Sequence, residues 1–307
     1  MKVREFAEGS DVSQALLVRE VERHPDHLKL VLGDRSGSVP AVVGHAASEL
    51  CRRGEVVFVT GRFTGAQLAI DSLRPASDAE YSRQDLRDGP AHDLDQMERD
   101  LRELLATIQN HHLRQLLGAV FAESWSGYRD APAGKRFHHA YRHGLLEHSL
   151  TVAQSVSAIS AMFPGIDRDV AVAGALLHDI GKLDAYELEA GTISMSDQGR
   201  LHGEISLGYY RVRRAIERLD GFPPELAQGV LHIILSHHGA LEHGSPVVPC
   251  TREATLVHMI DNLGGRLGSF DRLERQLRAG EQWSAWDKVL GAGAYFAPRR
   301  DSERAAA

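Results

Sequence analysis

The chain has 307 residues, of which 43% are hydrophobic and 25% charged, and its formal net charge is −7 at pH 7. This composition is typical of a globular protein with about two domains, and the acidic balance argues against a strongly basic duplex-binding protein. No stretch approaches the ~20 apolar residues of a membrane span, and the N-terminus lacks the apolar core of a secretory signal. Cys51 and Cys250 are too few for a disulfide framework. We therefore expect a cytoplasmic protein with reduced thiols and no membrane partner.

Five short runs rich in Val, Leu and Ile occupy the first 75 residues, and turn signals separate them. The runs cover residues 12–21, 27–32, 38–43, 55–63 and 67–73, with a helix-like insert at 45–53. Five strands with a helix between the third and fourth predict a small all-β OB-fold barrel over residues 1–75. Phe58 alternates with Val57 and Val59 and is expected in the barrel core.

Residues 76–93 are polar and rich in turn formers, so we expect a linker there. From residue 94 onward, apolar residues recur at helical spacing. The predicted helices cover 94–108, 110–124, 143–163, 168–179, 203–219, 224–236, 251–263 and 270–278. The pattern predicts a multidomain protein in which an all-α helical bundle over 94–298 follows the barrel, and 299–307 forms a flexible tail.

The dipeptide His178-Asp179 ends an otherwise apolar run, Ala-Gly-Ala-Leu-Leu-His-Asp-Ile-Gly-Lys over residues 173–182. Burying an imidazole and a carboxylate without partners would cost several kcal/mol. A divalent cation would satisfy both groups at once.

Three other predicted helices also place a polar group on an apolar face, at His148, His237 and Asp261. Each alone fits an ordinary core histidine or a capping aspartate. Together they would leave several buried polar groups without hydrogen-bond partners, and a metal ion bound by them would remove that cost. Mixed His/Asp ligation suits Mn, Fe, Zn or Mg.

The order His148, His178-Asp179, Asp261 resembles the HD superfamily of metal-dependent phosphohydrolases, which is named for its His-Asp pair. Three further segments resemble more closely the YhaM-type 3′→5′ exoribonucleases within that superfamily. They are Lys-Arg-Phe-His-His-Ala-Tyr-Arg-His-Gly-Leu-Leu-Glu-His at 135–148, Ile-Leu-Ser-His-His-Gly at 234–239, and residues 253–263. That family also carries an N-terminal OB-fold, in agreement with the β pattern.

The resemblance implies a centre of two divalent ions, with Mn first and Fe, Mg, Zn or Co as alternatives. It implies that the first ion is bound by His148, His178, Asp179 and Asp261. The second ion would be bound by His237 and His238, with Asp179 reaching toward it. Such a pair of ions can bind a phosphodiester and activate water, which removes the need for a side-chain nucleophile.

The resemblance also implies roles around the metals. Asp179 and Lys182 would be catalytic, and His258 would support a ligand instead of binding metal. Phosphate contacts would come from Lys135, His138, His139 and Lys182. The plainer alternatives are a cation favoured by the helix dipole for Lys182 and a surface loop for His138 and His139.

One segment departs from the family, which usually has a histidine where this chain has Glu204 in Leu-His-Gly-Glu-Ile-Ser. Either Glu204 binds the second metal through oxygen, or a local shift brings in His202. In a third alternative, the second site is weak and the metal preference altered.

The resemblance implies an exonuclease that releases 5′-mononucleotides from the 3′ end of single-stranded RNA, or of DNA, with the barrel guiding the strand. A barrel that serves only structure or assembly is the alternative. Two other functions stay open: a phosphohydrolase of nucleotides or cyclic dinucleotides, and a nucleic-acid or partner-binding protein with a regulatory metal site. A homo-oligomer is compatible with each.

Overall fold

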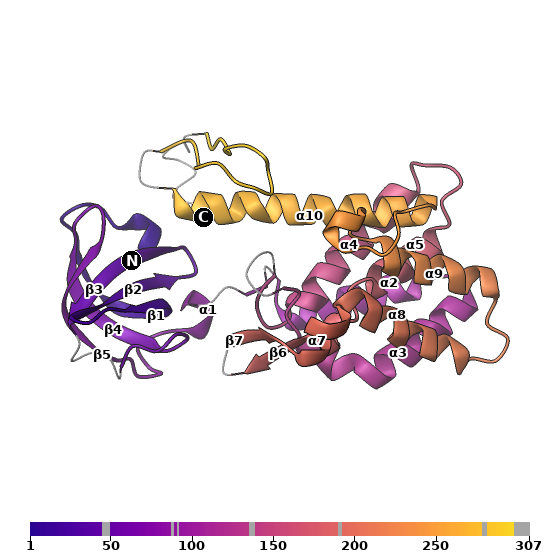
Figure 1. Cartoon of the computed structure of the whole chain (residues 1–307), viewed down its shortest axis with the longest axis horizontal. Coiled ribbons are helices and arrows are strands. Elements are labelled where there is room, and N and C mark those ends of the chain that lie inside the picture. The colour runs from indigo at the N-terminus through magenta and orange to yellow at the C-terminus, as the bar shows by residue number, and fades with distance from the viewer. Residues whose placement is uncertain are drawn as a thin grey trace. The chain divides into compact units, whose positions relative to one another are not determined.

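The computed structural model describes residues 1–44, 50–86, 89–90, 92–134, 139–189, 192–277 and 281–297 (Figure 1). The chain divides into two compact units, one of residues 1–88 and 269–307 and the other of residues 89–268. The predicted boundaries at residues 75, 93 and 298 stay predictions. None of the described helices combines the length and the apolar character needed to cross a bilayer.

The first unit contains a closed five-stranded barrel (Figure 1). Its strands are β1 (Asp11–Arg23), β2 (His27–Asp34), β3 (Gly37–Gly44), β4 (Val56–Phe63) and β5 (Leu68–Pro75). The order around the barrel is β1-β2-β3-β5-β4, and a short parallel pairing of β3 with β5 completes it. The predicted OB-like barrel is thereby confirmed. Most of the helical insert predicted at 45–53 lies outside the described residues. Two short helices, η1 (Val3–Glu5) and α1 (Arg83–Leu86), flank the strands.

Strand alternation sets the barrel core and corrects one prediction. Val57 and Val59 are buried in β4, whereas Phe58 between them is only partly buried. Successive side chains of a strand point to opposite faces, so a residue between two core valines belongs to the outer face. The Arg74 guanidinium covers the Phe58 ring at 4.4 Å from the ring centroid. The expectation that Phe58 lies in the core was therefore wrong.

The second unit is helical, as predicted. Its elements in chain order are α2 (Leu94–Ala106), α3 (His111–Asp130), α4 (Gly144–Ser160), α5 (Arg168–Leu177), α6 (Lys182–Ala185), α7 (Asp197–His202), α8 (Glu204–Glu217), α9 (Pro224–Ser236) and η3 (Leu241–His243). Helix α10 (Arg252–Gln276) joins the two helices predicted at 251–263 and 270–278.

A small hairpin interrupts the helices. Strands β6 (Tyr186–Glu189) and β7 (Thr192–Met195) pair antiparallel between α6 and α7. The β-branched Thr192 and Ile193 favour a strand there.

Polar residues begin several of these helices. Side-chain oxygens of Asp93, Asn110, Asp167 and Ser196 accept hydrogen bonds from backbone N–H groups in the first turns of α2, α3, α5 and α7. Such caps satisfy donors that have no partner within the helix. Helix α4 differs, because it starts after His143, whose φ is 70° and whose side chain does not cap it.

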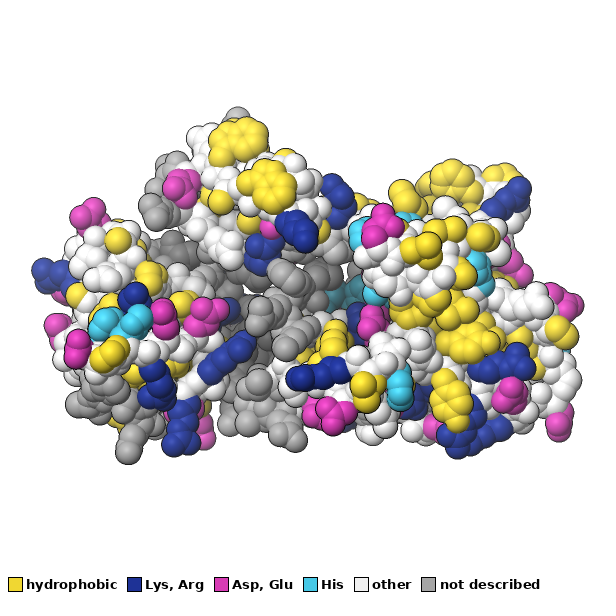
Figure 2. All heavy atoms as spheres, in the orientation of Figure 1, with side chains coloured by type: hydrophobic (Ala, Val, Ile, Leu, Met, Phe, Trp, Pro, Cys, Tyr) yellow, Lys and Arg dark blue, Asp and Glu magenta, His cyan; other side chains and the backbone are white. Residues whose placement is uncertain are grey.

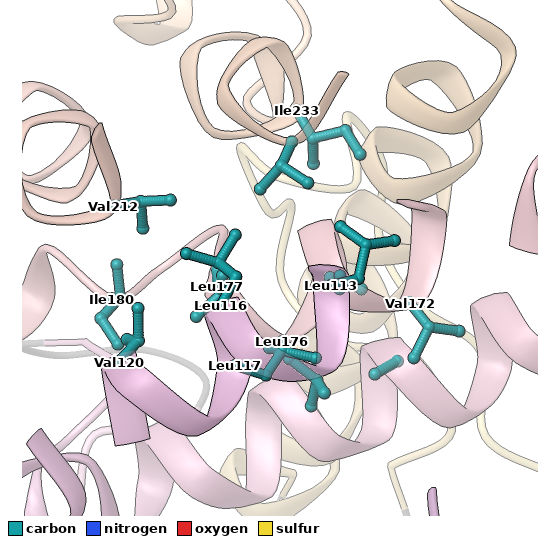
Figure 3. Close-up of a cluster of buried hydrophobic side chains, with 14 of the residues drawn as sticks. Leu113, Leu116, Leu117, Val120, Val172, Leu176, Leu177, Ile180, Val212 and Ile233 are labelled. Carbon is teal, nitrogen blue, oxygen red and sulfur yellow. The ribbon is translucent and has the colours of Figure 1, made fainter. Parts of the chain in front are cut away.

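A large part of the core of this unit lies between α3, α5, α8 and α9 (Figure 3), and buried residues of α2, α4 and α10 complete it. Leu113 and Leu117 of α3, Leu176 of α5, Val212 of α8 and Ile233 of α9 are 0–1% exposed. Helix α5 is buried on nearly all sides, which fits its run of alanines and leucines. This packing fixes the ends of α5 and α9, from which the next polar residues project.

Apolar side chains are also exposed on this unit, and Figure 2 shows them gathered on the face drawn there. The large ones that are more than about a third exposed are Met162, Phe163, Leu188, Leu201, Tyr210, Leu241, Val247, Val248, Met259, Leu263 and Leu267. Such surfaces are common at interfaces. The homo-oligomer stays a prediction.

Candidate metal centre

The turn between α5 and α6 carries His178 and Asp179, which are 1% and 2% exposed. Helix α5 ends at Leu177, and the N–H of Lys182 donates to the carbonyl of Asp179 to close the turn. Gly181 lets this turn approach α8 closely, because a Cβ there would collide with the carbonyl oxygen of Glu204. The sequence His-Asp-Ile-Gly-Lys therefore brings the end of α5 directly against the start of α8.

Two further helices bring partners to this turn. His148 of α4 places its Nε2 3.1 Å from Nε2 of His178 and 3.2 Å from Oδ2 of Asp179. Asp261 of α10 places its Oδ1 3.1 Å from Nε2 of His148 and 3.9 Å from Nε2 of His178. Three groups far apart in sequence thus meet at one buried point, as expected from their positions on the apolar faces of the predicted helices.

The spacing of these atoms fits a single cation. The donor atoms of His148, His178 and Asp261 all lie within 4.8 Å of one another. Ligands held about 2.1 Å from one ion stand about 3.0 Å apart at right angles and about 3.4 Å apart in a tetrahedron. Two of the observed separations, 3.1 and 3.1 Å, lie between those values, and the third, 3.9 Å, is somewhat longer.

The backbone fixes the orientation of two of the imidazoles. Nδ1 of His178 donates to the carbonyl of Ala175 at 2.7 Å, and Nδ1 of His237 donates to the carbonyl of Ile234 at 2.8 Å. A donating Nδ1–H leaves the Nε2 lone pair of a neutral ring available, and metal-binding histidines are held in this way. Both Nε2 atoms point toward Asp179.

Two buried atoms face each other in the second half of the centre. Nε2 of His237 lies 3.5 Å from Oδ1 of Asp179, and neither atom has a hydrogen-bond partner among the described residues. Leaving such atoms buried without partners is costly unless something else binds them. A cation bound between them would remove the cost, so this half of the centre also fits a metal.

His238 and Glu204 lie at the outer edge of this half. The ring of His238 is 4.3 Å from that of His237, and its Nε2 is 3.6 Å from Oε1 of Glu204. His202 instead ends α7 and is exposed, and no contact with the centre is recorded for it among the described residues. Of the two residues that the sequence offered, the structure brings Glu204 toward the histidines.

Lys182 contacts Asp179 directly. Its Nζ donates to Oδ2 at 2.6 Å from the first turn of α6. Burial by itself lowers the pKa of Lys182, but the Asp179 carboxylate outweighs burial and raises that pKa above its ordinary value. Lys182 is therefore a fixed positive charge beside the centre, at the first residue of the short helix α6.

The carboxylates also change the protonation of the histidines. Burial alone would lower the pKa of His148, but hydrogen bonds with Asp179 and Asp261 and the charges of both raise it to about 9. Burial raises the pKa of Asp261, but its hydrogen bond with His148 and the charges of His148 and His178 hold that pKa below its usual range. Without a cation the centre thus binds a proton at neutral pH.

The remaining predicted residues surround the centre or lie outside the described chain. Nδ1 of His258 donates to the carbonyl of His237 at 2.8 Å, so His258 supports the backbone at His237. The ring of His139 lies 5.5 Å from that of His148. Lys135 and His138 lie outside the described residues.

Sequence reasoning did not single out Glu147 and Tyr141. Glu147 is 6% exposed on α4, beside His148, and accepts a hydrogen bond from the Tyr141 hydroxyl. A carboxylate at a buried helical position, six residues after a tyrosine, was the available signal. This signal was overlooked because the neighbouring His148 already accounted for the resemblance of this segment to the family motif.

The HD domain family matches residues 145–265, a stretch that contains His148, His178, Asp179 and Asp261. With the buried centre described above, this match indicates that the chain carries an HD domain and is a metal-dependent hydrolase.

Over most of its length the chain is also similar to YhaM exoribonucleases. It is 28% identical over 298 residues to the 3′-5′ exoribonuclease YhaM of Shouchella clausii, and the aligned region covers 91% of each chain. It is 29% identical over 290 residues to the 3′-5′ exoribonuclease YhaM of Bacillus subtilis, covering 89% of this chain and 90% of the relative.

Proposed function

We propose that this protein is a metal-dependent 3′→5′ exonuclease that releases 5′-mononucleotides from single-stranded RNA, with single-stranded DNA as a second substrate. The observation that carries the proposal is the buried His148–His178–Asp261 cluster in a chain that resembles two 3′-5′ exoribonucleases over about nine-tenths of its length. The similarity spans the barrel as well as the helical unit, which favours a polymer substrate.

The proposed ligands follow the geometry of the centre. His148, His178, Asp179 and Asp261 would hold one ion, and Asp179, His237, His238 and Glu204 would hold a second. Mixed nitrogen and carboxylate donors suit several divalent metals, and Mn is proposed first, with Fe, Mg, Zn and Co as alternatives. Bound at such a site, divalent cations polarise a phosphoryl oxygen and lower the pKa of a coordinated water.

The side chains around the centre would bind and orient the substrate. Lys182 is held by Asp179 at 2.6 Å, where its charge can contact a phosphate oxygen entering the centre. His139, which lies beside His148, is proposed to contact the same phosphodiester. Lys135 and His138, from the segment that precedes His139, are proposed as further phosphate contacts.

The barrel is proposed to guide the single strand toward the centre. Its outer face offers an aromatic ring and a cation at Phe58 and Arg74, the two kinds of group on which bases and backbone are bound. Cytoplasmic location belongs to the same proposal, and the unpaired thiols of Cys51 and Cys250 fit it.

The test is an incubation of the full chain and Mn²⁺ with an oligoribonucleotide that carries a 5′ label and a single-stranded 3′ tail. A ladder that shortens by single nucleotides from the 3′ end, with 5′-mononucleotides as the released product, supports the proposal. A DNA strand of the same sequence measures the sugar preference, and Asp179→Asn is the inactive control.

Two results would replace the proposal. Hydrolysis of free nucleotides or cyclic dinucleotides, with the oligoribonucleotide left intact, would identify a small-molecule phosphohydrolase. Strand binding that Asp179→Asn leaves unchanged, without any hydrolysis, would identify a binding protein with a regulatory metal site.

A further inference from the structure

A buried carboxylate lies beside the metal centre but outside its set of ligands. The side chain of Glu147 is 7% exposed, and its Oε2 accepts a hydrogen bond from the Tyr141 hydroxyl and lies 3.5 Å from Nε2 of His139. Glu147 does not belong to the described group whose donor atoms lie within 4.8 Å of one another. Among the described residues, Glu147 contacts Tyr141 and His139.

The loop before α4 fixes where His139 can lie. His139 has φ of 55°, a conformation that is uncommon for a residue with a side chain. Its carbonyl accepts from the N–H of Ala133 at 3.1 Å and of Tyr141 at 2.9 Å. A Cβ at Gly144 would collide with that same carbonyl oxygen. Non-glycine residues in this conformation persist where the surroundings determine them, and they concentrate at functional sites.

The imidazole of His139 is directed at the centre from this loop. Its ring centroid lies 5.5 Å from that of His148 and 5.7 Å from that of Tyr141, which it meets edge-on. The side chain is only 10% exposed. Glu147 fixes the direction of one ring nitrogen, and because the ring is rigid it also fixes the direction of the other.

We propose that Glu147 and Tyr141 are positioning residues that act through His139, by holding its imidazole where it contacts the phosphodiester bound at the centre. The inference rests on the proposed function, because it takes a phosphodiester as the substrate. Carboxylates commonly hold catalytic and metal-binding imidazoles in orientation, and small displacements of a contacting group can cost up to about 10²-fold in rate.

A double-mutant cycle tests the inference. His139→Ala is expected to lower kcat/KM about a hundredfold, and Glu147→Gln and Tyr141→Phe about tenfold each. If Glu147 acts through His139, adding Glu147→Gln to His139→Ala lowers kcat/KM no further. Additive losses, or an unchanged rate in Glu147→Gln, would overturn the inference.

Metal content and binding give readouts that do not depend on turnover. Each variant is expected to keep the wild-type number of bound Mn²⁺ ions, while its affinity for a 5′-mononucleotide, measured by calorimetry, falls in parallel with kcat/KM. Loss of Mn²⁺ in Glu147→Gln would show that Glu147 acts on the metal centre instead. Glu123→Gln, an exposed carboxylate paired with Arg218, is the matched control and should behave as wild type.

The cycle is run in parallel on the oligoribonucleotide and on bis(p-nitrophenyl) phosphate. If the wild type hydrolyses only the small diester, the exonuclease proposal fails while the cycle on that diester still decides the inference. Hydrolysis of neither substrate would overturn both. Thermal unfolding of each variant shows that it is folded, and Tyr141→Phe carries the cycle if Glu147→Gln does not fold.

Discussion

Nε2 of His237 and Oδ1 of Asp179 face each other at 3.5 Å, buried and without hydrogen-bond partners among the described residues. The other oxygen of Asp179 contacts His148, His178 and Lys182. One carboxylate therefore reaches both halves of the centre. Its two oxygens have different surroundings, and this difference is the structural basis for proposing two cation positions.

Replacing Asp179 is expected to remove activity and metal together. Asp179→Asn should lower kcat/KM by at least about 10³-fold, because one substitution withdraws charge from both positions. It also leaves the buried ammonium of Lys182 without its carboxylate, so the metal-free variant should lose about 3 kcal/mol or more of stability. Denaturant unfolding and metal counting measure these effects. Asp220→Asn, at an exposed position, is the control, and a variant with normal rate and normal metal content would refute the role of Asp179.

Metal affinity is expected to rise with pH up to about 9, because Mn²⁺ must displace a proton from His148, whose pKa is raised to about 9. Each pH unit below that value should weaken binding by up to about tenfold. Titration of the metal-free protein with Mn²⁺ between pH 6 and 8 measures the slope. An affinity that is flat over this interval would contradict the assignment of His148.

The stability of the metal-free protein should fall as the pH rises, whereas its metal affinity should increase. The pKa of His148 is higher in the folded chain than its ordinary 6.5, so its contribution is fully present below pH 6.5 and is lost as pH rises through about 9. At about 1.36 kcal/mol per pH unit, this contribution reaches about 3 kcal/mol. Unfolding curves of the metal-free chain should shift to lower temperature across that window, and His148→Gln should abolish the shift.

Substitutions of Glu204 and His202 form a matched pair of variants that tests the second cation position. Glu204→Gln should reduce the number of tightly bound Mn²⁺ ions and lower kcat, because Glu204 lies 3.6 Å from His238. His202→Gln should change neither quantity, because His202 is exposed at the end of α7. Calorimetry and elemental analysis of both variants distinguish them. The reverse result would assign the ligand to His202.

Gly181 should tolerate no side chain. A Cβ at this position would collide with backbone atoms of Glu204 and Gly208, so Gly181→Ala should separate the His178-Asp179 turn from α8 and destabilise the chain by about 1–3 kcal/mol. Gly118 is the control: it lies within α3 with no atom near its Cβ position, and Gly118→Ala should stabilise by about 0.5–1 kcal/mol. Equal effects at the two glycines would refute the close approach.

Much of the fold was predictable, because alternation in the barrel strands and helical spacing after residue 94 are local signals. The start of α4 at His143, which has a left-handed backbone conformation, was not predictable. It is fixed by tertiary contacts, because no side chain caps the helix there. The glycines at 264, 265 and 268 lie between the two helices predicted at 251–263 and 270–278, yet α10 continues through them. Glycine weakens a helix by only about 1 kcal/mol, which packing readily offsets.

The inward-facing polar residues of the candidate site followed from apolar periodicity, which placed His148, His178 and Asp261 on buried faces. The choice between Glu204 and His202 could not follow from periodicity, because it depends on the backbone turn at Gly203, whose φ is 74°. The contact between Glu147 and His139 joins a helix to a loop, and sequence spacing does not encode such a contact.

The most direct test is anomalous diffraction from crystals of the full chain grown with Mn²⁺. Two peaks are predicted, one bounded by His148, His178, Asp179 and Asp261 and the other on the opposite side of Asp179, next to His237. A single peak would contradict the second cation position. Fully occupied Mn²⁺ elsewhere, with none beside Asp179, would contradict the centre as a whole.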